Sequence, residues 1–256
     1  MKKKRKDKAP KPVEQYVIGR REKNGFCWLV PAVAGQQADD QNLDAAEKFT
    51  SLIEAIAAST EYCVNVFEVV TDEGRSVLQE IMVDRHKIDS MPFDGCFELM
   101  DQLLAGPSFV CNHWRLTQER ILRLAAARVD CIISLVTRAE LFWERDQLDR
   151  LWFDDLFRHH HFPIADGSVP SHGMAVLILD TIDAAIERGQ KIFLRCVGGR
   201  GRTGVICGIF AVRHGVATGE GALNFLAKRR YQYGLFKIAP ETESQREFVR
   251  SWKIGQ

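Results

Sequence analysis

An apolar strand, a glycine-rich loop and an apolar helix are predicted to follow one another without a break between Lys191 and His214. The strand is expected over Lys191–Arg195 and the helix over Val205–His214. A helix N-terminus offers unpaired N–H groups and a partial positive charge, and glycines let the preceding backbone curl so that such groups point inward. This segment therefore predicts a cradle for a phosphate-sized anion at the end of a buried strand.

The loop of this cradle also carries groups that are suited to covalent chemistry. Cys196 lies at its mouth, where N–H donors favour the nucleophilic thiolate. Arg202 can reach back with a planar fork that matches two phosphate oxygens, and Thr203 can donate its hydroxyl to the sulfur. Attack on phosphorus would leave a phosphocysteine that water hydrolyses. The expected phosphate-binding residues are Val197, Gly198, Gly199, Arg200, Gly201 and Arg202.

Cleavage of a phosphate ester also needs a proton for the leaving oxygen, and a carboxyl group on a flexible loop is a usual source. The loop Phe162–Gly167 supplies Asp166. We expect Asp166 to act as general acid in the first step and as base toward water in the second.

The flanking sequence predicts the fold class. Residues 117 onward alternate between helical and strand patterns, and Val129–Val136 is an apolar run that is typical of a buried parallel strand. Helices are expected over Gln118–Arg128, Leu141–Leu156 and Ala175–Arg188. We therefore expect a three-layer α/β/α domain with a mainly parallel central sheet, and the site at the C-terminal end of the Ile192–Arg195 strand.

The spacing Cys196-x5-Arg202-Thr203 after a strand resembles the signature of the protein tyrosine phosphatase superfamily. The loop Phe162-Pro163-Ile164-Ala165-Asp166 resembles that of the dual-specificity subgroup and its bacterial relatives. Further similarity lies in Ile133–Val136 with Glu140, and in Pro240–Val249 before Trp252, so the resemblance covers about residues 105–256. It implies a tyrosine-phosphatase-like fold, the site roles given above and a phosphorylated substrate. No metal or organic cofactor is expected, because cysteine, arginine, aspartate and backbone N–H groups suffice for the chemistry.

One residue departs from the family pattern, because Arg195 stands before the cysteine where the family usually has histidine. A cation there can favour the thiolate if its side chain points toward the sulfur. The alternative is a catalytically weak adapter that binds phosphate without turnover. Gln245 is a second candidate accessory residue, which would contact substrate or order water, with helix capping as its alternative.

The substrate has one leading interpretation and one alternative. A phosphoprotein is the leading substrate for a phosphatase of the tyrosine or dual-specificity type. The basic loop Gly199–Arg202 keeps a phosphoinositide or inositol phosphate as the alternative.

The first twelve residues carry seven Lys or Arg and one Asp. Such a run is expected to form a disordered tail, and its charge leaves an acidic partner, a nuclear address or a nucleic-acid-binding function open. Residues 13–104 are expected to form a small α+β unit and a connector. This part includes a helix over Asn42–Ala58, a hairpin of Tyr62–Val70 and Ser76–Val83, and a short helical piece at Phe97–Leu104.

Composition limits the remaining classes. The seven cysteines are odd in number and contain no CxxC pair, so neither a disulfide framework nor a zinc site is expected. The longest apolar runs are too short to cross a bilayer, and the charged start lacks the apolar stretch of a secretory signal. We expect a cytoplasmic protein.

Overall fold

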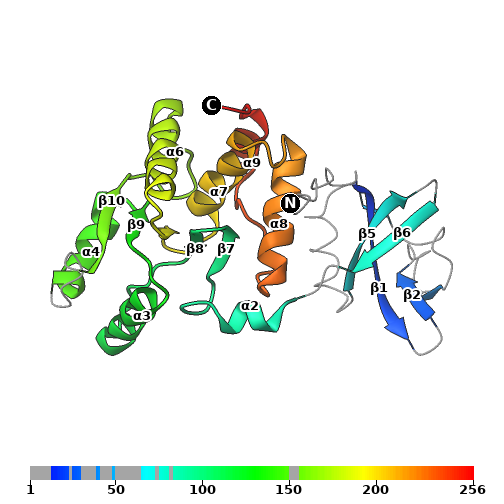
Figure 1. Cartoon of the computed structure of the whole chain (residues 1–256), viewed down its shortest axis with the longest axis horizontal. Helices are drawn as coiled ribbons and strands as arrows, with labels where there is room; N and C mark the ends of the chain where they lie inside the picture. The colour runs from blue at the N-terminus through cyan, green and yellow to red at the C-terminus, as the bar shows by residue number, and fades with distance from the viewer. Residues whose placement is uncertain are drawn as a thin grey trace, which may run out of the picture. The chain divides into compact units, whose positions relative to one another are not determined.

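The computed structural model describes residues 83–149 and 156–256, together with the backbone of six strands within residues 13–80 (Figure 1). The side chains of 145–147 and 149 lie outside the description. The chain divides into two compact units, residues 1–82 and residues 83–256.

The second unit is built on a five-stranded sheet with the strand order β10-β9-β11-β8-β7. The first four strands in this order run parallel, and β7 pairs antiparallel with β8. Every residue of β8, β9 and β11 is buried, as expected for apolar strands that are covered on both faces. The strands are β7 Phe97–Met100, β8 Leu103–Gly106, β9 Cys131–Ser134, β10 Arg158–His161 and β11 Ile192–Arg195.

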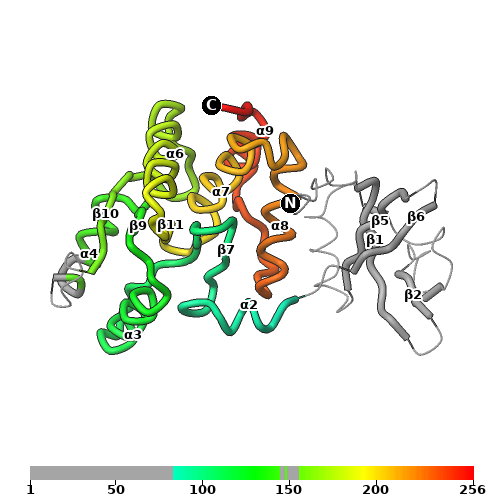
Figure 2. The backbone as a smooth tube through the Cα atoms, in the orientation of Figure 1, coloured from blue at the N-terminus to red at the C-terminus, as the bar shows by residue number. Residues whose placement is uncertain are grey.

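Helices cover this sheet, which confirms the α/β class with a mainly parallel centre (Figure 2). Ile121 and Leu124 of α3 and Leu148 of α4 join Ile132 and Phe193 in one core cluster. Helix α6 contacts β11, and α7 contacts β8 and the helices α6, α8 and α9. The helices are α2 Arg85–Asp89, α3 Trp114–Ala126, α4 Arg138–Asp149, α6 His172–Glu187, α7 Gly201–Arg213, α8 Glu220–Gln232 and α9 Glu243–Ser251.

The region expected to be a connector belongs to the second unit. Instead of a helical piece, Phe97–Leu104 contains β7 and the start of β8, joined by a tight turn in which Gln102 has a φ of 66°. Apolar residues at 97, 99, 103 and 104 fit both a helical and an alternating pattern. The strand forms because β8 pairs with β11. The boundary between the units therefore falls at 82/83 instead of 104/105.

The described part of the first unit is an antiparallel sheet with the order β3-β2-β1-β5-β6, and β4 pairs with β1. The predicted hairpin is confirmed, since Asp72 pairs with Arg75. The helix expected over Asn42–Ala58 is wrong at Lys48–Phe49, which form a strand, whereas 50–58 and the tail 1–12 lie outside the described residues. The strands are β1 Val13–Glu22, β2 Gly25–Leu29, β3 Asp39–Asp40, β4 Lys48–Phe49, β5 Asn65–Asp72 and β6 Arg75–Glu80.

Within the described parts of both units, no helix has the length and apolar character that a membrane crossing needs.

Candidate active site

The loop that follows β11 has its backbone carbonyls fixed from outside. The Arg195 carbonyl accepts a hydrogen bond from Leu135 N–H at 2.9 Å, and the Val197 carbonyl accepts one from Ser108 N–H at 2.9 Å. The buried Arg230 guanidinium donates to the Gly199 carbonyl at 3.1 Å. A loop that is to offer N–H groups to an anion must direct its carbonyls elsewhere, and these three donors hold them.

Cys196 begins this loop and is only 3% exposed. The Gly199 N–H donates to its Sγ at 3.2 Å, which stabilises negative charge on the sulfur. The hydrogen bond expected from Thr203 is not made: the Thr203 hydroxyl is buried and has no hydrogen-bond partner within the described part of the chain. The backbone therefore takes over the role that the sequence assigned to this hydroxyl.

Gly199 permits the sharp turn of the loop. Its φ is +66°, and a Cβ placed on it would lie 2.4 Å from the carbonyl carbon of Gly106 and 2.5 Å from Pro107 N. Both contacts are with backbone, so rotation of a side chain cannot relieve them.

Gly199→Ala is expected to lower the free energy of unfolding by about 3 kcal/mol, because a left-handed φ and a backbone clash add together. Urea unfolding of the two proteins measures the loss. Gly198→Ala is the matched control for stability, since a Cβ there meets nothing within 4 Å. Equal losses in the two variants would contradict the steric explanation.

Arg202 joins the loop to two other segments. Its side chain is 1% exposed, and Nη1 and Nη2 donate to Glu140 Oε2 and Oε1 of α4 at 2.7 and 3.0 Å. Nη1 also donates to the Ile164 carbonyl at 3.1 Å, and Nη2 lies 3.0 Å from Asp166 Oδ1. The guanidinium of Arg202, which was expected to bind phosphate, is thus oriented by the carboxylates of Glu140 and Asp166.

Glu140 is a site residue that sequence reasoning noted only within the family resemblance. It also accepts from the N–H and the hydroxyl of Thr137, and its own N–H donates to that hydroxyl. The spacing Thr137-x-x-Glu140 is a capping box, the one local signal for its position. The hydrogen bond from Arg202 lowers the pKa of Glu140 to about 2.

This pKa predicts a component of acid stability. Because the folded pKa is lowered from 4.5 to about 2, the stabilisation is present above pH 4.5 and is lost as the pH falls through the folded value. It amounts to at most about 3 kcal/mol, reduced by solvent screening because the Glu140 side chain is 30% exposed.

Glu140→Gln should therefore flatten the dependence of unfolding free energy on pH in this acid range. Chemical denaturation at several pH values measures it, with Glu119→Gln on the exposed side of α3 as the control. A curve for Glu140→Gln that is parallel to that of the parent would show that this ion pair carries no stability.

Asp166 lies on the loop between β10 and α6, and its side chain is 78% exposed. Further hydrogen bonds tie this loop to other segments: Ile164 N–H donates to the Leu135 carbonyl, Thr242 donates to the Gly167 carbonyl, and Gln245 donates to the Ser168 carbonyl. The structure therefore brings Asp166 to Arg202, and through it to the loop of Cys196.

Gln245 is completely buried, and its amide is occupied by the protein itself. Its Oε1 accepts from the N–H groups of Glu241 and Thr242, both at 3.1 Å, and it completes a capping box at the start of α9. With Nε2 bound to the Ser168 carbonyl at 3.0 Å, it anchors the loop of Asp166. The capping alternative is the one that the geometry supports.

Val197 and Arg200 are two further residues that were predicted to bind phosphate. Val197 is 48% exposed at the rim of the loop. Arg200 forms an ion pair with Glu241 at 3.1 Å, so part of its charge is already compensated.

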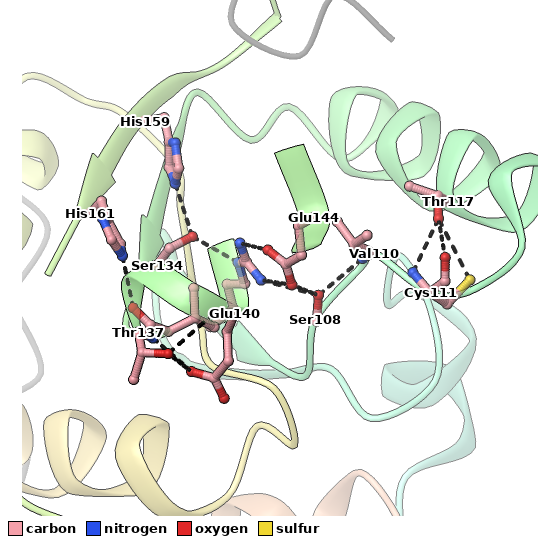
Figure 3. Close-up of polar contacts among 12 residues, drawn as sticks. Ser108, Val110, Cys111, Thr117, Ser134, Thr137, Glu140, Glu144, His159 and His161 are labelled. Carbon is pink, nitrogen blue, oxygen red and sulfur yellow. Dashed lines mark hydrogen bonds and ion pairs between the residues drawn. The ribbon is translucent and has the colours of Figure 1, made fainter. Parts of the chain in front are cut away.

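Arg195 does not have the orientation that a direct contact with the thiolate needs. Its guanidinium is fully buried and donates hydrogen bonds to Ser108, Ser134 and Glu144, which are labelled in Figure 3. The physical reason is that Glu144 of α4 pairs with the guanidinium, and the hydroxyls of Ser108 and Ser134 accept its other hydrogen bonds. Arg195 therefore does not meet the condition under which it could favour the thiolate directly, which is a side chain that points toward the sulfur.

Two of the three consecutive histidines at 159–161 have separate hydrogen-bond partners. His159 Nε2 lies 2.9 Å from Ser134 Oγ, and His161 Nε2 lies 2.7 Å from the Val136 carbonyl. Burial lowers the pKa of His159 to about 4, so the ring is neutral at neutral pH. Among residues that the structure describes, no group of three His, Cys, Asp or Glu side chains is placed to hold a metal ion.

Comparisons with known proteins show which family part of the chain resembles. Residues 111–216 match the Tc-R-P family model, described as a polymorphic toxin system DSP-PTPase phosphatase. The resemblance to the dual-specificity phosphatases is confirmed. The kinase associated phosphatase with a serine in place of its catalytic-site cysteine superposes with a TM-score of 0.51 at 22% identity, over 60% of this chain and 90% of that chain. Tk-PTP in its active form gives a TM-score of 0.49 at 20% identity, over 61% of this chain and 95% of that chain.

Curated sequences also resemble this dual-specificity-like part of the chain. An uncharacterized protein of Methanocaldococcus jannaschii is 32% identical over 92 residues, which are 36% of this chain and 57% of that protein. A second protein of the same organism is 29% identical over 89 residues, which are 35% of this chain and 51% of that protein. The chain thus spans about half the length of the curated relatives it matches.

Proposed function

We propose that this chain hydrolyses phosphate monoesters through a phosphocysteine on Cys196, as a protein tyrosine or dual-specificity phosphatase. The observation that carries the proposal is the position of Arg202, which reaches Asp166 from the same loop that begins with the buried Cys196. A nucleophile, an anion-binding fork and a carboxyl group therefore meet at one end of the parallel sheet.

In the first step, Cys196 Sγ attacks phosphorus, an S–P bond forms and the bond from phosphorus to the ester oxygen breaks. Asp166 in its acid form gives its proton to the leaving oxygen. In the second step, water attacks phosphorus while the Asp166 carboxylate accepts a proton. The S–P bond then breaks, and inorganic phosphate and the thiolate are released.

Arg202 and the loop backbone stabilise the charge that develops on the phosphoryl oxygens. Glu140 keeps the fork oriented through two hydrogen bonds, and a phosphate oxygen takes the place of Asp166 at Nη2. Asp166 is thereby freed for the leaving group. This exchange explains why an exposed carboxylate contacts the buried arginine before substrate arrives.

A phosphoprotein is the preferred substrate. Val197 of the phosphate loop has an exposed apolar side chain, and so do Phe236 and Ile238. Arg200 of the loop donates a hydrogen bond to the Ile238 carbonyl. Apolar surface therefore lies beside the cradle. The ion pair between Arg200 and Glu241 reduces the positive charge available to a multiply charged phosphoinositide. These contacts favour an aromatic or peptide phosphate over a phosphoinositide.

Turnover of an aryl phosphate by the parent, Cys196→Ser and Asp166→Ala proteins tests this function. We expect robust turnover by the parent, a loss of about 10²-fold or more with Asp166→Ala, and no turnover with Cys196→Ser. Equal, negligible rates in all three proteins would refute the enzyme and favour the phosphate-binding adapter. Comparison of phosphotyrosine, phosphoserine and phosphothreonine peptides with phosphoinositides then separates the substrate classes.

A further inference from the structure

Arg195 ends β11 immediately before the nucleophile, and its guanidinium uses all three nitrogens inside the protein. Nε donates to Ser134 Oγ at 2.7 Å, Nη1 donates to Ser108 Oγ at 3.1 Å, and both Nη atoms donate to Glu144, at 2.7 and 2.6 Å. The guanidinium carbon lies 4.9 Å from the ring centre of Phe109. A buried cation with this many fixed partners has a single orientation.

Glu144 is the acceptor at the centre of this network. The residue is 8% exposed and lies on α4, and its Oε1 accepts from Ser108 Oγ at 2.8 Å in addition to Arg195 (Figure 3). Ser134, on the other side of Arg195, is completely buried and contacts the ring of His159. The network thus links α4 with three strands or the segments that follow them.

Ser108 connects the network to the phosphate loop. Its side chain contacts both Glu144 and Arg195, and its backbone N–H donates to the carbonyl of Val197 at 2.9 Å. The backbone carbonyl of Arg195 is held in turn by Leu135 N–H at 2.9 Å. Of the two residues on either side of Cys196, Arg195 is a member of the buried pair, and Val197 is held by Ser108, which contacts both members of the pair.

Helix α4 carries a second carboxylate one turn earlier. Residues at positions i and i+4 share one face of a helix, and here Glu140 binds Arg202 while Glu144 binds Arg195. The two arginines are the residue before the nucleophile and the residue that binds phosphate. One helix face thus holds both ends of the loop.

We propose that Glu144 and Arg195 form a positioning pair, which aligns Cys196 and Arg202 for phosphoryl transfer by fixing the phosphate loop to α4. The proposal rests on the proposed function and deepens it, because it assigns a role to the residue that departs from the family pattern. Neither side chain touches the substrate. Their contribution is the orientation of the loop, for which a small misplacement costs about 10²-fold in rate.

A set of variants separates positioning from stability. Glu144→Gln and Arg195→Met each leave a buried group without its partner and should destabilise the fold. The double variant Arg195→Met/Glu144→Leu removes both charges, and apolar replacement of a buried ion pair is often neutral for stability. Ser108→Ala keeps the charges paired and removes the hydroxyl between them. The matched control is the double variant Arg123→Met/Glu119→Leu, in which an exposed ion pair is replaced in the same way.

We expect the double variant to fold like the parent and to lose about 10²-fold in kcat with little change in KM, and Ser108→Ala to lose about 10-fold in kcat. Iodoacetamide should also alkylate Cys196 more slowly in both variants than in the control. Parent values of kcat and alkylation rate in either variant would overturn the proposal. If the parent itself does not turn over, the proposed function fails, and the alkylation rates alone still decide whether the pair positions the cysteine.

Discussion

Replacing Cys196 with serine is expected to abolish hydrolysis of an aryl phosphate, with a loss on the order of 10⁶-fold in kcat, the size that removal of a covalent nucleophile has in other hydrolases. Serine keeps the shape of the side chain but has no ready anion at neutral pH, so no phosphoryl–enzyme bond forms. Stopped and continuous assays of phosphate release measure the loss.

The same variant should still bind inorganic phosphate, because Arg202 and the loop backbone are unchanged. Equilibrium binding of phosphate to the parent and to Cys196→Ser is the control. Turnover that survives the substitution would show that another group attacks phosphorus and that Cys196 is a structural cysteine.

Arg202→Lys is expected to lower kcat/KM by about 10²–10³-fold, since lysine keeps the charge but cannot donate two parallel hydrogen bonds. The loss should be larger than for a surface arginine, because the Arg202 fork is also held by Glu140. Steady-state kinetics with the aryl phosphate measure it.

Arg213→Lys is the matched control on the same helix, where arginine pairs with Asp183 away from the loop. Its kcat/KM should equal that of the parent. A similar loss of kcat/KM in both variants would mean that any arginine-to-lysine change on α7 lowers activity. The fork of Arg202 would then have no special role.

Much of the second unit could be predicted from local sequence. Apolar runs at 131–134 and 192–195 indicated buried parallel strands, and the glycine loop before an apolar helix indicated the anion cradle. These features depend on residues that are close in sequence, so a single segment contains the information.

The parts that could not be predicted depend on contacts between distant segments. The hairpin of β7 and β8 forms because β8 pairs with β11, although its apolar spacing also fits a helix. The role of Arg195 depends on Glu144, which is 51 residues away, and that of Arg202 depends on Glu140, which is 62 residues away. A lone glutamate in a helical pattern indicates only a solvated face, so neither pair could be found from the sequence.

The most direct test of the account is to quench the reaction with an aryl phosphate during turnover and to determine the mass of the peptide that contains Cys196. We expect that this peptide carries one phosphoryl group, that the group disappears as substrate is exhausted, and that Cys196→Ser never acquires it. Phosphate release by the parent with no phosphoryl group on Cys196 at any time would contradict the mechanism.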